Sequence, residues 1–264
     1  MAIKAVLFDL DDTLLWDERS VSEAFAATCL KAQQAKAVDP GRLEEAVRKE
    51  ARELYESFET FPFTKQIGIN PYEALWATFS GGSDENFYLL RRFAPHYRRE
   101  AWRRGLQAVG VSDPKLAAEL AELFPRERRN RPYVFDETFP VLNQLAGTYK
   151  LLLLTNGAPD LQEEKIRSIP GLAQYFDHIV ISGNFGQGKP AQAIFLHALE
   201  LLGIAADEGI MVGDKLTTDI LGANSVGLKS VWINRRNSVR SDDIIPAFEI
   251  DSLLKLADIL EQLA

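Results

Sequence analysis

The sequence is poor in the residues that form disulfides or bind zinc. Its 264 residues include one cysteine and three histidines. A lone cysteine cannot pair within the chain, so an intramolecular disulfide is excluded and a reducing compartment, the cytoplasm, is expected. Cys29 lies at helical spacing from Val21 and Phe25. We therefore predict that it is a small buried apolar residue rather than a catalytic thiol.

Long hydrophobic runs and an excess of positive charge are also missing. The first apolar run, Ile3–Phe8, is too short for a secretion signal and leads into acidic residues. No stretch approaches the length that spans a bilayer. The net charge of −8 disfavours non-specific binding to nucleic acid. We therefore expect a cytoplasmic protein with neither a membrane nor a nucleic acid as its partner.

Hydrophobic residues make up 46% of the chain, which is enough for a sizeable core. Five short apolar runs have the length and residue types of buried strands. They are Ile3–Phe8, Tyr149–Leu154, His178–Ile181, Gly209–Val212 and Ser230–Ile233. Helical patterns separate the later runs and follow the last, at 160–168, 190–202, 217–226 and 252–263. This alternation predicts an α/β fold with a doubly wound parallel sheet.

The segment between the first two runs has a different character. From residue 15 to residue 131 strand signals are almost absent, and apolar residues recur at helical spacing. Asn70 and Pro71 mark one helix start, and Glu73 is placed to complete a capping box. We predict a core domain made of residues 1–15 and 132–264, with an all-helical domain, 16–131, inserted into it.

Two groups of polar residues are assigned no part in a functional site. Arginines cluster near the end of the helical block, where a solvated helix end and linker explain them better than a substrate-binding patch. The histidines lie at the start of a strand, beside a proline, or at helical spacing with apolar residues. The two groups are Arg126, Arg128, Arg129 and Arg131, and His96, His178 and His197.

Other polar residues follow the predicted strands. The first strand leads into Asp9 and Asp11, the second into Thr155-Asn156-Gly157 and the fourth into Asp214, while Lys189 precedes a helix. Each piece alone has an ordinary explanation as a turn, a helix cap or a surface lysine. Ligands of open α/β sheets bind outside the carboxyl ends of the strands. The ordered set therefore favours one shared site.

As a set, these residues resemble the motifs of the haloacid dehalogenase-like (HAD) hydrolases, whose members are mostly phosphatases. The first motif, DxDxT, is matched by Asp9-Leu10-Asp11-Asp12-Thr13, and the second by Thr155. The third is matched by Lys189, and the acidic pair of the fourth by Asp214 and Asp219. The resemblance covers the predicted core domain. It implies a Rossmann-like HAD core, with the helical block as a cap domain.

The resemblance implies a role for each motif residue. Asp9 is the expected nucleophile, which forms an aspartyl-phosphate, and Lys189 balances charge. Asp11 is the expected general acid and base, and crowding by Asp9 and Asp12 is expected to keep it protonated at the start. Asp12 itself needs no role beyond shaping the turn.

The remaining motif residues are expected to bind phosphate and metal. Mg²⁺ is the implied cofactor, held by Asp9, Asp214 and the backbone carbonyl of Asp11. Thr155 and the N–H groups of Asn156 and Gly157 are expected to hold phosphate oxygens. Asp219 is expected to orient the metal ligands or Lys189, and Thr13 is expected to fix the loop.

The resemblance thus implies a Mg²⁺-dependent phosphomonoesterase that acts on a small metabolite of the phosphoserine, nucleoside monophosphate or sugar phosphate type. The carboxylate of Asp11 favours phosphoryl transfer, because the dehalogenase branch of the family generally lacks it. A phosphomutase, a non-enzymatic phospho-switch and a binding protein stay open as alternatives. So do the substrate, the choice between monomer and homodimer, and the effect of Lys215, where many relatives carry serine.

Overall fold

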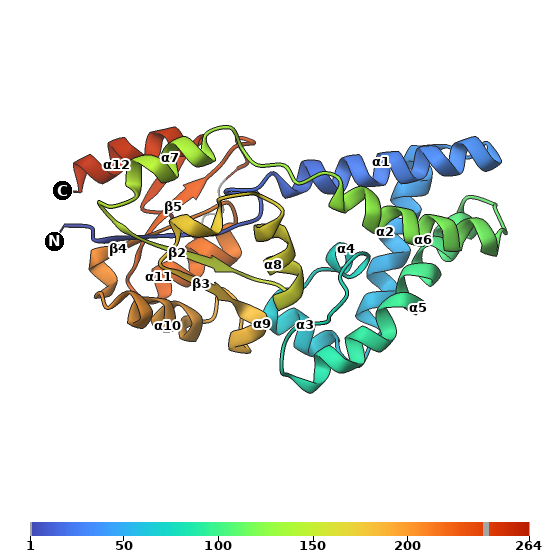
Figure 1. Ribbon diagram of the computed structural model, residues 1–264, viewed down its shortest axis with the longest axis horizontal. Helices are drawn as coiled ribbons and strands as arrows, with labels where there is room; N and C mark the ends of the chain where they lie inside the picture. The colour runs from blue at the N-terminus through green and yellow to red at the C-terminus, as the bar shows by residue number, and fades with distance from the viewer. Residues whose placement is uncertain (1, 240–242, 264) are drawn as a thin grey trace. The chain divides into compact units, whose positions relative to one another are not determined.

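The computed structural model describes residues 2–239 and 243–263. The chain divides into two compact units, which Figure 1 shows as ribbons. The sheet unit comprises Met1–Trp16, Val134–Gly157 and Gln162–Ala264, and the helical unit comprises Asp17–Tyr133 and Ala158–Leu161. Helix α8 (Pro159–Arg167) is therefore divided between the two units.

Within the described residues, six parallel strands form the centre of the sheet unit, which confirms the predicted fold class. Their order is β3-β2-β1-β4-β5-β6. The sequence did not predict β6, because its three residues at the edge of the sheet are too few to show a strand pattern. The strands are β1 (Ala5–Phe8), β2 (Lys150–Thr155), β3 (His178–Ile181), β4 (Gly209–Gly213), β5 (Lys229–Ile233) and β6 (Phe248–Ile250).

Alternate side chains of β1 point to opposite faces of the sheet and join two separate apolar cores. Val6 and Phe8 pack in the core that also contains side chains of α7 (Thr138–Leu145) and α12 (Leu256–Gln262). Ala5 and Leu7 pack in the core shared with α10 (Gln192–Leu202) and α11 (Leu221–Ser225). Helices thus cover both faces of the sheet (Figure 1), as the term doubly wound requires.

The order of the strands positions the site. β1 lies between β2 and β4, and Phe8 is in register with Leu153 of β2 and Val212 of β4. The three parallel strands therefore end side by side at the same edge.

The predicted helix at 217–226 begins instead as a π-helical turn, Leu216–Ile220, and continues as α11. The short helices are α9 (Ser182–Phe185), Ala173–Tyr175, Ala206–Glu208 and Leu253–Lys255.

The helical unit has its own aromatic core. The ring of Phe25 lies 4.5 Å from that of Phe124 and 6.0 Å from that of Trp102. Cys29 is buried in the same core, as predicted, and burial raises the pKa of its thiol to about 12. The helices are α1 (Asp17–Lys36), α2 (Pro40–Glu56), α3 (Phe61–Ile67), α4 (Pro71–Ala74), α5 (Glu85–Ala108) and α6 (Pro114–Arg129).

Two predictions about the helical unit had different outcomes. The capping box is confirmed, because Asn70 accepts from the N–H of Glu73 while Glu73 accepts from the N–H of Asn70. The interpretation of Arg128 as solvated is wrong. Its side chain is buried, pairs with Asp17 at 2.6 Å and lies over the ring of Trp76.

Among the described helices, none is both long and apolar enough to cross a membrane.

Candidate active site

A buried lysine and two carboxylates form the centre of the candidate site. Asp9 directly follows β1, and its Oδ1 lies 2.6 Å from Nζ of Lys189. The same Nζ lies 2.7 Å from Oδ1 of Asp219, in the π-helical turn, and donates to the carbonyl of Leu154 at 2.7 Å. Burial opposes the charged form of Lys189, but Asp219 and Asp9 outweigh it and raise its pKa. Lys189 is therefore a cation held between two acidic side chains.

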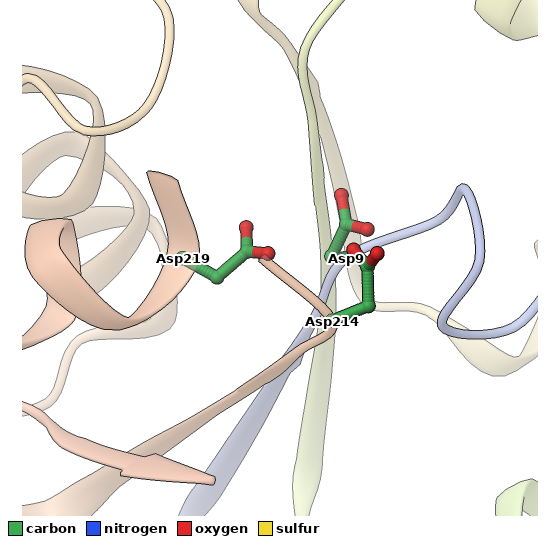
Figure 2. Close-up of side chains that lie close together, drawn as sticks. All are labelled: Asp9, Asp214 and Asp219. Carbon is green, nitrogen blue, oxygen red and sulfur yellow. The ribbon is translucent and has the colours of Figure 1, made fainter. Parts of the chain in front are cut away.

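Asp214 adds a third carboxylate to this group. It follows β4, and one oxygen each from Asp9, Asp214 and Asp219 lie within 4.8 Å of one another. Figure 2 shows the side chains of Asp9 and Asp214 close together, with Asp219 approaching from its helical turn. Burial, with a contribution from neighbouring carboxylates, raises the pKa of both Asp9 and Asp214. Three acids with one lysine leave an excess of negative charge that suits a cation.

The side chain of Asp219 is engaged through both oxygens. Oδ1 pairs with Lys189, and Oδ2 accepts from the backbone N–H of Lys215 at 3.0 Å. A Cβ on Gly213 would lie 2.4 Å from the carboxyl carbon of Asp219, so only glycine leaves room for this carboxylate. Asp219 thus contacts both Lys189 and the loop that carries Asp214, whose carbonyl also accepts from the indole of Trp232.

The Thr155-Asn156-Gly157 segment continues from β2 and forms a loop with defined contacts. The side chain of Asn156 donates to the carbonyl of Lys189 at 2.9 Å and accepts from its N–H at 2.8 Å. The N–H of Gly157 donates to Oγ of Ser182 at 2.9 Å. Asn156 therefore positions the backbone of Lys189, a role that its place after a strand did not reveal. The N–H of Gly157 already has an acceptor within the protein.

Asp11 lies beside a cation that the sequence reasoning missed. Oδ2 of Asp11 accepts from Nζ of Lys165 at 2.8 Å and from Nε2 of Gln162 at 3.1 Å. Both donors are on α8 and both are buried. No signal in the sequence could have found them, because a polar residue on a helix is more often exposed. The expectation that Asp11 is crowded by acidic groups alone is therefore wrong, because its carboxyl group has the ammonium group of Lys165 as a partner.

The turn after Asp11 is held from several sides. Asp12 has a φ of 61°, which short polar side chains tolerate, and its N–H donates to the carbonyl of Leu15 at 2.7 Å. Asp12 thus lies within the turn, and the expectation that it shapes the turn stays a prediction. Thr13 donates to Oδ2 of Asp9 at 3.2 Å. Its carbonyl accepts from the guanidinium of Arg235 at 3.0 Å, which the sequence analysis did not anticipate.

The sheet therefore brings most of the predicted residues into contact or close proximity. Asp9, Lys189, Asp219 and Asp214 form one cluster, and Thr13 contacts Asp9. Thr155 is linked to Asp11 through the amide of Gln162, which donates to both. The expected role of the Asp11 carbonyl as a metal ligand stays a prediction.

Comparisons with known proteins agree with this geometry. A family model for haloacid dehalogenase-like hydrolases matches residues 3–227. The phosphoserine phosphatase of Thermus thermophilus is 36% identical over 258 residues, which cover 95% of this chain and 96% of that protein. The glyceraldehyde 3-phosphate phosphatase of Methanopyrus kandleri is 30% identical, and the match covers 99% of both proteins.

A solved structure supports the fold. The HAD-hydrolase YfnB of Bacillus subtilis, determined with bound magnesium, superimposes with a TM-score of 0.69 at 21% identity. The superposition covers 98% of this chain and 99% of that one. The family match extends over most of the chain and includes every motif residue that suggested the resemblance. The chain therefore belongs to the haloacid dehalogenase-like hydrolases.

Proposed function

We propose that this protein is a Mg²⁺-dependent phosphomonoesterase that hydrolyses a small phosphorylated metabolite through an aspartyl-phosphate on Asp9. The observation that carries the proposal is the position of Asp9, whose carboxylate lies 2.6 Å from Nζ of the buried Lys189 and within 4.8 Å of a carboxylate oxygen of Asp214. Full-length relatives that are phosphatases support the same reaction class. The helical unit is the proposed cap.

The side chains of the cluster fit a magnesium ion. They offer carboxylate oxygens, which are hard ligands, and they carry three acidic groups against one lysine. Burial, with a contribution from neighbouring carboxylates, raises the pKa of Asp9 and Asp214, and a bound cation would oppose both effects. Asp9 and Asp214 would hold the ion, together with the carbonyl of Asp11, while Asp219 stays with Lys189. When bound, Mg²⁺ would neutralise phosphate charge and so permit attack by an anion.

Asp9 is held in one orientation for nucleophilic attack. Lys189 contacts Oδ1 and Thr13 donates to Oδ2, so that both oxygens have a fixed partner. In the proposed first step, a carboxylate oxygen of Asp9 forms a bond to phosphorus as the ester P–O bond breaks. The electron pair of that bond goes to the leaving oxygen, which takes a proton from the carboxyl group of Asp11.

The second step regenerates the enzyme. Asp11, now a carboxylate, takes a proton from a water molecule whose oxygen attacks the phosphorus of the aspartyl-phosphate. The bond between phosphorus and Asp9 breaks, and inorganic phosphate leaves. Throughout both steps Lys189 balances charge on Asp9 and on the transferring group. The hydroxyl of Thr155 accepts from Gln162 at 2.6 Å and donates to the carbonyl of Asn156 over 3.5 Å, a long contact that a phosphate oxygen would replace.

Turnover of p-nitrophenyl phosphate with and without Mg²⁺ tests the proposal. We expect hydrolysis that needs the metal and is abolished by Asp9→Asn, which keeps the shape of the side chain but removes the nucleophile. Equal activity of wild type and Asp9→Asn would show that the nucleophile is misassigned. Release of inorganic phosphate without a bisphosphate activator would separate a phosphatase from a phosphomutase of the same family.

A panel of small phosphomonoesters then addresses the substrate class. The names of the relatives suggest phosphoserine, glyceraldehyde 3-phosphate and N-acylneuraminate 9-phosphate as first members. We expect kcat/KM for one class of these compounds to exceed that for p-nitrophenyl phosphate. Uniformly poor turnover of the panel, with efficient turnover of a phosphopeptide, would contradict the small-molecule assignment.

A further inference from the structure

Helix α8 presents two buried polar side chains to Asp11. Gln162 and Lys165 are three residues apart, so they lie on the same face of the helix. Both donate to the same oxygen, Oδ2 of Asp11, at distances of 3.1 and 2.8 Å. Asp11 is more than 150 residues away along the chain. The contact therefore depends on the fold and has no local cause.

The burial of Lys165 shows that this contact is specific. Its side chain is only 4% exposed, whereas that of Arg167 on the same helix is 70% exposed. A buried ammonium group is unfavourable unless an acidic group and hydrogen bonds compensate for the lost hydration. Asp11 supplies the ion pair, so the position of Lys165 is closely tied to the position of the Asp11 carboxyl group.

Gln162 extends the connection to the loop after β2. Its Nε2 donates to Oγ1 of Thr155 at 2.6 Å as well as to Asp11. The side chain also packs against Gly157, where an added Cβ would lie 2.8 Å from Cγ and Cδ of Gln162. One amide thus contacts the proposed phosphate-binding threonine and the proposed acid, and the glycine leaves space for it.

We propose that Lys165 and Gln162 are positioning residues that fix the carboxyl group of Asp11 for proton transfer. Gln162 also fixes the position of this carboxyl group relative to the loop proposed to hold the phosphate. This inference rests on the proposed phosphatase function. A carboxyl group that points about 1 Å away from the leaving oxygen transfers a proton poorly, because proton transfer requires hydrogen-bond distance. Lys165 and Gln162 restrict Asp11 from the side of α8.

The test compares two substrates that differ in their need for an acid. An alkyl phosphate has a poor leaving group, which must be protonated, whereas p-nitrophenyl phosphate leaves readily without a proton. The ratio kcat/KM reports the steps up to transfer of the phosphoryl group to Asp9. We expect Lys165→Met to lower kcat/KM by on the order of 10- to 100-fold for the alkyl phosphate and by less than about threefold for the aryl phosphate.

Two further variants separate positioning from a general structural role. Lys165→Arg keeps the cation and is expected to restore at least part of the activity towards the alkyl phosphate. In an Asp11→Asn background, Lys165→Met should add little, because the group that it positions is already absent. Arg167→Met removes an exposed cation from the same helix and serves as the matched control, with no change expected for either substrate.

Equal losses on both substrates, or a full additional loss in the Asp11→Asn background, would overturn the inference. If Lys165→Met does not fold, as judged by its melting curve, Gln162→Met provides the same comparison. Gln162 is neutral, so its removal leaves the ion pair between Lys165 and Asp11 in place. Failure of the proposed function itself has a different signature. In that case wild type and Asp9→Asn would hydrolyse the aryl phosphate equally, whatever residue stands at position 165.

Discussion

Nζ of Lys189 lies 2.7 Å from Oδ1 of Asp219, in an ion pair whose two side chains are almost completely buried. Asp9 accepts from the same ammonium group at 2.6 Å. One cation therefore compensates two carboxylates, and Asp214 adds a third acid to the cluster. Removing one member of such a group leaves the others buried without compensation, so its effect should exceed that of breaking a surface pair.

The first prediction concerns Lys189→Met. Without the ammonium group, the carboxylates of Asp9 and Asp219 lose their cation, and we expect the free energy of unfolding to fall by about 3–5 kcal/mol in metal-free buffer. Urea unfolding measures this loss. Because a divalent cation can partly replace the missing charge, saturating Mg²⁺ should raise the melting temperature of the variant more than that of wild type.

Lys255→Met is the matched control for that experiment. Lys255 also pairs with an aspartate, Asp251 at 2.8 Å, but both side chains are more than half exposed. Its loss should change the free energy of unfolding by less than about 1 kcal/mol, and the response to Mg²⁺ should stay that of wild type. Similar destabilisation by the two variants would show that Lys189 is not essential to the charge balance of the site.

The sequence predicts this part of the molecule well, because strands of a parallel sheet end at one edge. That rule alone brings Asp9, Thr155 and Asp214 near one another, although they are far apart along the chain. This rule does not predict the contacts that side chains of helices make. Nothing in the spacing of Gln162 or Lys165 indicates that they face Asp11, since a polar residue on an amphipathic helix is more often exposed.

Two other features escaped prediction for similar reasons. Asn156 resembles an ordinary turn residue, and its contacts with the backbone of Lys189 depend on a loop 33 residues later in the chain. Arg128 was interpreted as solvated because a run of arginines ends its helix, yet the packing of Trp76 and Asp17 encloses it. A run of charged residues predicts that its side chains are exposed on average, whereas tertiary contacts determine whether each one of them is buried.

The second prediction concerns Gly157→Ala. Gly157 has a φ of +146°, which side-chain-bearing residues rarely adopt, and the new methyl group would lie 2.8 Å from Gln162. We expect the loop that carries Thr155 to move away from Gln162, with a fall in kcat/KM of on the order of 100-fold for p-nitrophenyl phosphate, because this loop is proposed to bind the phosphate. Steady-state kinetics with Mg²⁺ measure this loss.

Gly147→Ala isolates the backbone part of that effect. Gly147 also has a positive φ, +81°, but an added Cβ would meet nothing within 4 Å. It should lower the free energy of unfolding by about 1 kcal/mol and leave kcat/KM unchanged. If both variants lower activity to the same degree, the space beside Gln162 does not matter for the site.

The third prediction concerns Arg235, which holds the turn behind Asp11. Its guanidinium donates to the carbonyl of Thr13 and to Glu137, and lies 3.7 Å from the centre of the Phe135 ring. Arg235→Lys cannot reproduce this planar, stacked arrangement, so it should destabilise the protein by about 1–3 kcal/mol. Arg236→Lys, at an exposed position next to it, should be neutral. Equal melting temperatures of the two variants would refute the assigned role.

The fourth prediction concerns pH. In the folded protein the pKa of Asp9 and of Asp214 is raised above the ordinary value of 3.8, chiefly by burial. As pH rises past this value, the unfolded chain releases these protons first, while the folded state retains them up to its raised pKa. The folded state then binds more protons, so these two groups make the metal-free protein less stable with increasing pH across that window.

Magnesium should reverse this trend, because it binds the deprotonated carboxylates in competition with protons. We expect the increase in melting temperature at a fixed Mg²⁺ concentration to grow as the pH rises above the ordinary aspartate pKa of 3.8. Asp214→Asn removes one of the raised groups and a proposed ligand, so its metal-free stability should decline less with pH than that of wild type, and its response to Mg²⁺ should be small at every pH. A Mg²⁺ effect in wild type that is the same across this range would mean that the ion binds elsewhere, since only ligands that exchange protons for metal make the stabilisation depend on pH.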